Sequence, residues 1–168
     1  MRDLLNKLHN YGLMIKQQFP EITKLKIVAS DDQVVDDLKK YAKNDIGLYL
    51  VEPEIPKEGN ADYTKDVINM QFIILSKIPD KIPDLEILKR KDQLLNLTYD
   101  IDETILADHG NYNDFNFQFS TTDPNLPDRD LRCELLSFLD ASSIIKAPLS
   151  NMKDYIGWTI IFKLKIEA

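Results

Sequence analysis

The segment from Gly157 to Ile166 alternates strictly between two kinds of side chain. Apolar side chains occupy every second position: Trp158, Ile160, Phe162, Leu164 and Ile166. The positions between them carry a mixed set: Thr159, Ile161, Lys163 and Lys165. A period of two is typical of a β-strand with one buried face. We therefore predict a final strand that closes a sheet, with Trp158, Ile160 and Phe162 in the core.

The composition indicates one globular domain over residues 1–168. A hydrophobic content of 43% argues against disorder. Cys133 is the single cysteine, which excludes an internal disulfide, and we interpret it as a small apolar strand residue. The net charge of −7 argues against DNA as a ligand of the surface as a whole. No apolar run approaches the roughly 20 residues of a membrane helix, and no export signal is visible, so we expect no membrane partner.

Three stretches have apolar residues at helical spacing. The first covers residues 4–19 and ends at a proline. The second opens at the capping-box pair Ser30–Gln33 and is predicted to reach about residue 43. The third is predicted over residues 89–108, with Gly110 as its stop.

The remaining apolar segments have extended patterns. Residues 67–78 are apolar on both faces, since Phe72 and Ile74 alternate with Ile73 and Leu75, and this predicts a central strand. Further strands are predicted over residues 24–29, 46–51, 115–119, 131–139 and 143–149. Residues 131–139 are also compatible with a helix, but alternation around Cys133 and Leu135 favours a strand.

Two polar segments that contain prolines, Glu52 to Asp66 and Thr121 to Asp130, are predicted to be exposed loops. Together these elements predict an α+β fold. Its sheet is mixed and mostly antiparallel, and it packs against two or three helices.

The sequence Asp100-Ile101-Asp102-Glu103-Thr104 is similar to the nucleophile motif of haloacid-dehalogenase-like phosphatases, in which two aspartates act with magnesium. In that family the motif follows a strand near the start of a parallel sheet. Here it lies inside a predicted helix, where Asp100 and Asp102 do not share a face. We therefore interpret it as part of a solvated helix face.

The other polar motifs do not form a recognisable active site. Residues 108–114 are rich in oxygen ligands, but the closing glutamate of a calcium loop is replaced by Phe119. His9 and His109 lie on different predicted helices, and the five glycines are too scattered to cradle a phosphate. We therefore expect no enzyme activity, no catalytic residues, no cofactor and no metal.

The order of elements resembles that of the tail-terminator and tail-completion (neck) proteins of long-tailed bacteriophages. Residues 4–19 resemble the opening helix of that family, and Asn69 to Leu75 resemble its central strand. Ala147 to Leu149, the turn through Asp154 and the strand from Gly157 resemble its closing strand pair. An additional helix at residues 31–43 and an insertion at residues 131–149 leave open which tail or neck component this is.

The resemblance implies a structural virion protein at the head–tail junction or tail end. Such proteins assemble as rings that complete or terminate the tail, and the resemblance implies a hexamer of this chain. It also implies other tail or head-connector proteins as partners, assembly in the host cytoplasm and a final location in the virion. DNA would pass through the ring lumen without sequence-specific binding, and the acidic balance of the chain would limit sticking.

Several residues are candidates for contacts between subunits. The outer face of the last strand is partly apolar: Thr159, Ile161, Lys163 and Lys165. The two predicted loops add further candidates: Glu58, Asn60, Asp123 and Asn125. In the alternative interpretation, a helix of the same subunit covers the outer strand face.

Two other functions remain as alternatives. A non-viral protein-interaction or adaptor domain would share the α+β layout without forming a ring. A magnesium-dependent phosphatase would use Asp100 and Asp102, and its activity would be lost in the substitution Asp100→Asn.

Overall fold

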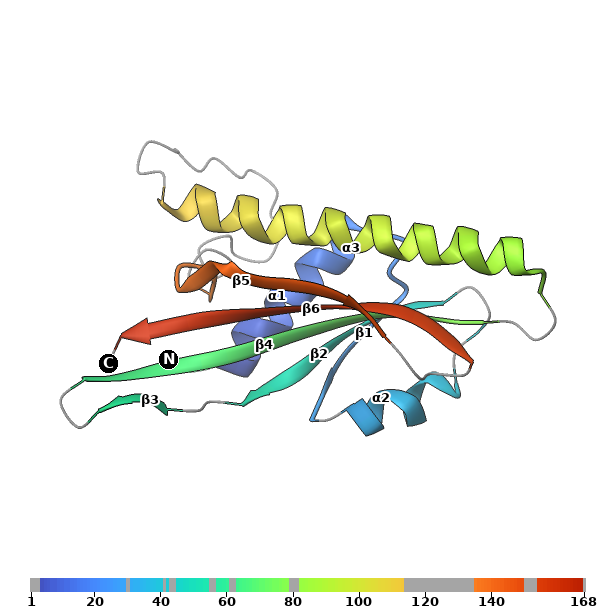
Figure 1. The fold of residues 1–168 in the computed structure, drawn as a ribbon. Helices are drawn as coiled ribbons and strands as arrows, with labels where there is room; N and C mark the ends of the chain where they lie inside the picture. The colour runs from blue at the N-terminus through green and yellow to red at the C-terminus, as the bar shows by residue number, and fades with distance from the viewer. Residues whose placement is uncertain are drawn as a thin grey trace.

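The computed structural model describes residues 4–29, 31–40, 42, 45–54, 57–60, 63–78, 82–113, 135–149 and 154–167. These residues form one mixed β-sheet with helices on both faces (Figure 1). The elements, in chain order, are α1 (Leu4–Gln18), β1 (Lys24–Val28), α2 (Asp31–Leu38), β2 (Ile46–Glu54), β3 (Lys57–Asn60), β4 (Tyr63–Lys77), α3 (Asp84–Asn113), β5 (Leu139–Pro148) and β6 (Tyr155–Glu167).

The strands are ordered β1-β2-β4-β6-β5, and β3 pairs with β4 beyond the end of β2. β1 and β2 are parallel and are joined through α2, because a parallel pair needs a crossover connection. All other neighbours are antiparallel. The predicted α+β class, with a mixed and mostly antiparallel sheet, is therefore confirmed.

β4 and β6 form the centre of the sheet. They pair without interruption from Lys65 with Glu167 to Lys77 with Tyr155. β6 is thus an interior strand, because β5 pairs along its other side and is the edge of the sheet within the described residues. The predicted closing strand pair is the β5–β6 hairpin.

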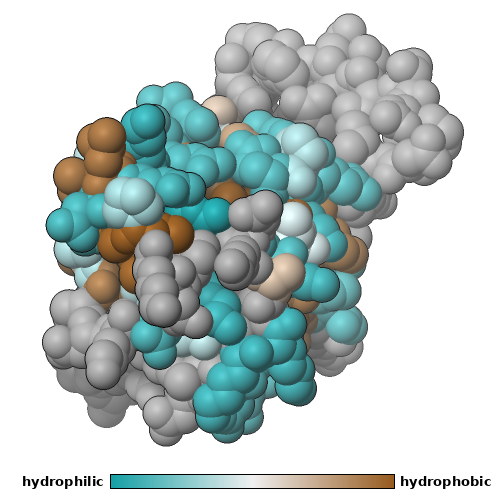
Figure 2. Space-filling view, turned by 90° about the vertical axis from the view of Figure 1, so that its right-hand side faces the viewer, coloured by the Kyte–Doolittle hydropathy of each residue, from teal (hydrophilic) through white to brown (hydrophobic). Residues whose placement is uncertain are grey.

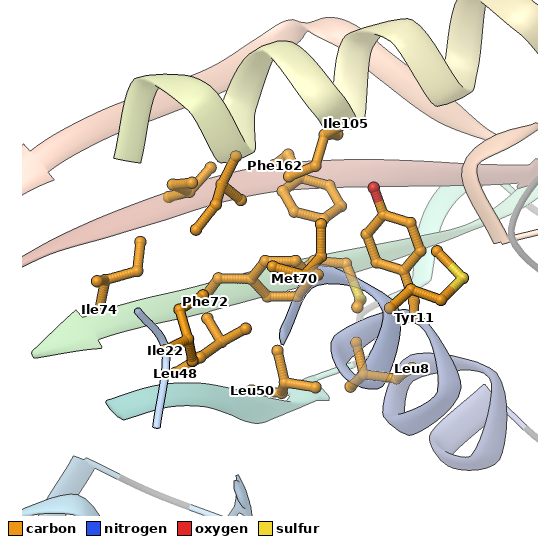
Figure 3. Packing of buried hydrophobic residues seen from close by; sticks show 14 of the residues in the cluster. Leu8, Tyr11, Ile22, Leu48, Leu50, Met70, Phe72, Ile74, Ile105 and Phe162 are labelled. Atoms are coloured by element: carbon orange, nitrogen blue, oxygen red, sulfur yellow. The ribbon is translucent and has the colours of Figure 1, made fainter. Parts of the chain in front are cut away.

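The main core lies between the sheet and the helices α1 and α3. Phe72 of β4 and Phe162 of β6 meet edge to face, with ring centroids 5.3 Å apart, and Tyr11 of α1 packs beside them (Figure 3). Ile160 and Phe162 are fully buried, as the alternation predicted, whereas Trp158 is half-buried at the margin of the core.

A smaller apolar cluster lies on the opposite face of the sheet, under α2. Val34 of this helix packs against side chains of three strands: Val28, Tyr49, Ile73 and Leu75. The neighbours Ile73 and Ile74 therefore belong to different cores, as their alternation predicted.

The prediction that residues 52–66 form an exposed loop is wrong. β2 continues to Glu54, and the β3–β4 hairpin occupies most of the remainder. Pro53 lies at the register shift between Val51 and Glu54, a position where a ladder tolerates a residue without an N–H. Pro53 thus marks an irregularity within a strand pair, because main-chain pairing with β4 continues past it.

The helix ends and one strand were also predicted incorrectly. The second helix ends at Leu38, not near residue 43. The third runs from Asp84 to Asn113, so Gly110 lies inside it, and its first turn gains from Asp84 and Glu86 at the positive end of the helix dipole.

The strand predicted over residues 131–139 is largely wrong where it is described. Leu135 and Leu136 form a helical turn and are both buried, and β5 begins only at Leu139. The strand predicted at residues 115–119, the loop at residues 121–130 and Cys133 lie outside the described residues.

Candidate functional site

A buried ion pair joins α3 to the edge strand β5. The Lys146 ammonium donates a hydrogen bond to Oδ2 of Asp102, and the two side chains are 23% and 7% exposed. The Lys146 Nζ also lies 4.9 Å from the centre of the Tyr99 ring, which is within cation–π range. Oδ1 of Asp102 is buried and has no hydrogen-bond partner among the described residues. This pair holds the long helix against the sheet edge.

The geometry separates the two aspartates of the phosphatase-like motif. Asp100 is exposed on α3, whereas Asp102 is buried and bonded to Lys146. The interpretation that these aspartates do not share a helix face is thus confirmed, but the interpretation of the motif as a solvated helix face is wrong for Ile101 and Asp102, which are buried against the sheet. Within the described residues, no group of three His, Cys, Asp or Glu side chains is placed to hold a metal ion.

The two histidines are on different helices, as predicted. His9 is exposed on α1, and His109 lies on α3. Nδ1 of His109 lies 2.8 Å from the main-chain oxygen of Leu136, and it must carry the proton because a carbonyl only accepts. This bond ties α3 to the turn before β5, which is a structural role.

A hollow of about 300 Å³ opens where α3 begins and the β5–β6 hairpin ends. Most of the residues that line it are apolar, among them Ile87, Pro148 and Trp158, while Lys91 and Tyr155 supply polar side chains. Figure 2 looks onto this end of the molecule and shows hydrophobic residues gathered at its upper left. Among the described residues, this hollow offers two polar side chains, fewer than the converging set that normally positions a substrate for chemistry.

The predicted contact face of β6 divides into a covered part and an open part. Thr159 is buried, and its hydroxyl donates a 3.2 Å hydrogen bond to the main-chain oxygen of Phe72. Ile161 is half-buried, and Lys163 and Lys165 are exposed. No helix of the described chain therefore covers the two lysines, and their contact with another subunit stays a prediction.

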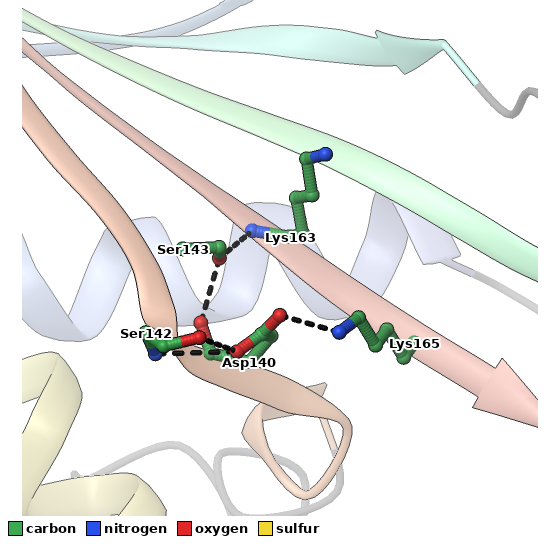
Figure 4. Close-up of polar contacts among 5 residues, drawn as sticks. All are labelled: Asp140, Ser142, Ser143, Lys163 and Lys165. Carbon is green, nitrogen blue, oxygen red and sulfur yellow. Dashed lines mark hydrogen bonds and ion pairs between the residues drawn. The ribbon is translucent and has the colours of Figure 1, made fainter.

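The open part of this face is organised by Asp140 at a bulge of β5 (Figure 4). Its carboxylate accepts hydrogen bonds from the Ser142 hydroxyl at 2.6 Å and from Lys165 at 2.6 Å. The Ser143 hydroxyl donates to the Asp140 carbonyl and accepts from the Lys163 N–H. Lys165, and then Ser142, lower the pKa of the Asp140 carboxyl.

The other predicted contact residues are only partly described. Glu58 and Asn60 lie on β3, where their main chains pair with Lys65 and Tyr63, so they belong to a strand and not to a loop. Asp123 and Asn125 lie outside the described residues. β3 pairs with the first part of β4 beyond the end of β2, and the end of β6 pairs with the same part of β4. We call these three paired segments the arm, and they extend past α1 and α3 in Figure 1.

Sequence reasoning missed an apolar stripe on the outer flank of α3. Its large exposed side chains are Leu85, Leu88, Tyr99 and Leu106. Residues 85, 99 and 106 are separated by multiples of seven, which was visible in the sequence. The signal was masked because the core stripe of the same helix, which includes Leu94 and Ile101, is equally apolar.

A scan against models of known protein families finds no match to this chain, and a search of curated proteins finds none either. None of the helices in the described part of the chain is both long and apolar enough to cross a membrane.

Proposed function

We propose that this chain is a structural subunit of the head–tail junction or tail end of a long-tailed bacteriophage. In this role it assembles with copies of itself into a ring, and the family resemblance suggests six subunits. Other tail or head-connector proteins bind the ring. The net charge of −7 limits the adhesion of DNA that passes through the lumen.

The observation that carries this proposal is the arm formed by β3, β4 and β6. It extends beyond both helices of the main core, while the opposite edge of the sheet ends at β5 (Figure 1). A projecting arm and a separate open edge are different surfaces of one subunit. Contacts between different surfaces are heterologous, and they close into rings when the rotation between subunits allows it.

The edge strand β5 supports the same assembly. An edge strand presents unpaired N–H and C=O groups that a neighbouring chain can pair with. The order of the described elements also supports the resemblance, since the opening helix, central strand, long helix and closing strand pair follow one another. We do not propose the phosphatase, because Lys146 occupies the Asp102 carboxylate on a different side of the helix from Asp100.

The proposal is tested by the mass and shape of the purified chain. We expect light scattering to give a multiple of the chain mass and negative-stain microscopy to show closed rings. Replacing residues 57–66 by an Asn-Gly turn removes the arm and should abolish the rings, while circular dichroism still shows the folded core. A particle that stays small at every concentration overturns the ring proposal and favours the adaptor alternative.

A further inference from the structure

The hollow at the start of α3 is lined by three separate parts of the fold. Ile87 and Lys91 come from α3, and Ile78 follows β4. The other lining residues come from the β5–β6 hairpin: Pro148, Leu149, Tyr155, Ile156, Gly157 and Trp158. Its volume of about 300 Å³ lies at the lower end of the range of small-molecule sites. A water molecule in the liquid takes about 30 Å³, so the hollow has room for a ligand of roughly ten non-hydrogen atoms.

The walls of the hollow suit the apolar body of a ligand. Ile87 and Trp158 are half-buried on opposite elements, and Ile156 is buried. Tyr155 is half-buried and packs against the small cluster under α2. A flat ring or a short hydrocarbon chain would replace water at these side chains and make apolar contacts with them.

Lys91 is the only charged side chain among the described residues that line the hollow. It makes no ion pair within the described part of the chain. The residues three and four positions away on α3, where helical ion pairs form, are all apolar: Ile87, Leu88, Leu94 and Leu95. Lys89 differs from Lys91, because Glu86 and Asp92 both lie three positions from it. The charge of Lys91 is thus left for a ligand.

We propose that the hollow binds a small amphipathic anion, with one ring or a short chain as its body and a single carboxylate. The body lies between Ile87 and Trp158, and the carboxylate accepts hydrogen bonds from the Lys91 ammonium. One lysine balances one negative charge, so a carboxylate fits better than a phosphate ester, which carries nearly two. The two polar side chains of the lining can orient such a ligand without reacting with it.

This site goes beyond the proposed structural role and does not depend on it. All the lining residues belong to one chain, so binding needs no ring. β4 runs from the arm to the hollow over 15 residues, or about 50 Å at the rise of a strand. Removal of the arm should therefore abolish rings and leave the affinity for the ligand unchanged.

Fluorescence of Trp158 tests the proposal directly, because Trp158 is the single tryptophan of the chain and lines the hollow. Titration of the full chain with 3-phenylpropanoate should shift the emission to shorter wavelengths and saturate, since the ring displaces water from a half-buried indole. A ligand of this size should have a dissociation constant of about 1 mM. The uncharged 3-phenylpropanamide has the same shape and should bind about fivefold more weakly, as expected for the loss of one exposed ion pair.

Two pairs of variants locate the site. Lys91→Met should make the acid bind as weakly as the amide, whereas Lys89→Met removes an equal charge outside the hollow and should keep the preference for the acid. Ile87→Phe reduces the volume of the hollow and should weaken binding of both compounds, whereas Leu88→Phe, at the next and exposed position, should not. The proposal is overturned if the emission shift does not saturate or if the acid and the amide bind equally to the wild type. Identical behaviour of the two variants of either pair also overturns it.

Discussion

The two faces of the sheet are covered by different amounts of structure. On one face α1 and the long helix α3 enclose a large core that reaches every strand except the short β3. On the other face α2 covers a small cluster near β1, β2 and β4, and no described helix covers the surface towards β5. The same strands supply both faces, so alternate residues of one strand experience different surroundings.

We infer from this difference that one face mainly stabilises the fold and that the other is available for contacts with another subunit. The face under α1 and α3 is enclosed by apolar packing and a buried ion pair, and it contributes most of the stability of the fold. The opposite face has a smaller apolar cluster under α2 and adds polar contacts made by exposed lysines, such as Lys26 with Asp37 of α2 and Lys165 with Asp140 of β5. An exposed, polar face can change its contacts at low energetic cost, which is what a surface for another subunit needs.

The neighbours Ile73 and Ile74 give the most direct test of this contrast, because they have the same side chain and differ only in the face they occupy. Ile74→Ala should reduce the free energy of unfolding by about 4 kcal/mol, since its cavity is enclosed on all sides. Ile73→Ala should cost about 2 kcal/mol, because the smaller cluster can relax. Urea denaturation measures both, and equal losses would contradict the difference between the faces.

The ion pairs differ in the same direction. Asp102→Ala leaves the Lys146 ammonium largely buried without its partner, and should cost about 3 kcal/mol. Asp140→Ala removes the partner of Lys165, whose exposed ammonium stays in contact with water, and should cost distinctly less. The double variant Asp102→Leu with Lys146→Met should recover most of the loss, because it removes both charges. A double variant as unstable as Asp102→Ala would show that the pair itself is not the cause.

For substitutions of two glycines, we expect the larger loss of stability on the side of the smaller cluster. A Cβ on Gly157 would lie 2.3 Å from a methyl of Leu75 and 2.4 Å from the main-chain oxygen of Ile74, so the strands would have to separate. Gly157→Ala should therefore cost about 2 kcal/mol. On α1, a Cβ on Gly12 would meet the ends of the Leu50 and Leu25 side chains, which can move. Gly12→Ala should change stability by less than about 1 kcal/mol, because helix propensity offsets the crowding. Thermal unfolding of the two variants ranks them.

Acid should act on the α2 face first. The hydrogen bond from Lys26 lowers the pKa of Asp37 below its usual 3.8, and Lys165 does the same for Asp140. A carboxyl with a lowered folded pKa contributes stability above pH 3.8, and this contribution is lost as the pH falls from there through the folded pKa. Hydrogen exchange at decreasing pH should thus show α2 opening before α3.

The variants Asp37→Asn and Lys26→Met each remove one partner of the Lys26–Asp37 contact, and with it the contribution of this contact to the pH dependence of stability. Both should lower stability slightly at neutral pH and flatten its loss in acid. An unchanged acid profile in both variants would show that another group controls it.

Prediction succeeded where the apolar pattern alone sets the structure. Residues 67–78 are apolar on both faces, and the strand they predict is the centre of the sheet. Prediction failed where main-chain pairing determines the secondary structure, as in the β3–β4 hairpin. The polarity of a segment does not show which strand it pairs with. Asp102 and Lys146 are 44 residues apart, and nothing local to either residue indicates that they form an ion pair.

The sequence by itself determined the half-buried strand from Gly157, the two-sided strand before it and the α+β class, since each follows from local periodicity. Only the tertiary structure decided that β6 is an interior strand and that residues 57–66, predicted as a loop, belong to the arm. It also decided which of the two apolar stripes of α3 faces the core. Periodicity shows that a face is apolar, but the partner that covers it depends on contacts between residues that are distant in the chain.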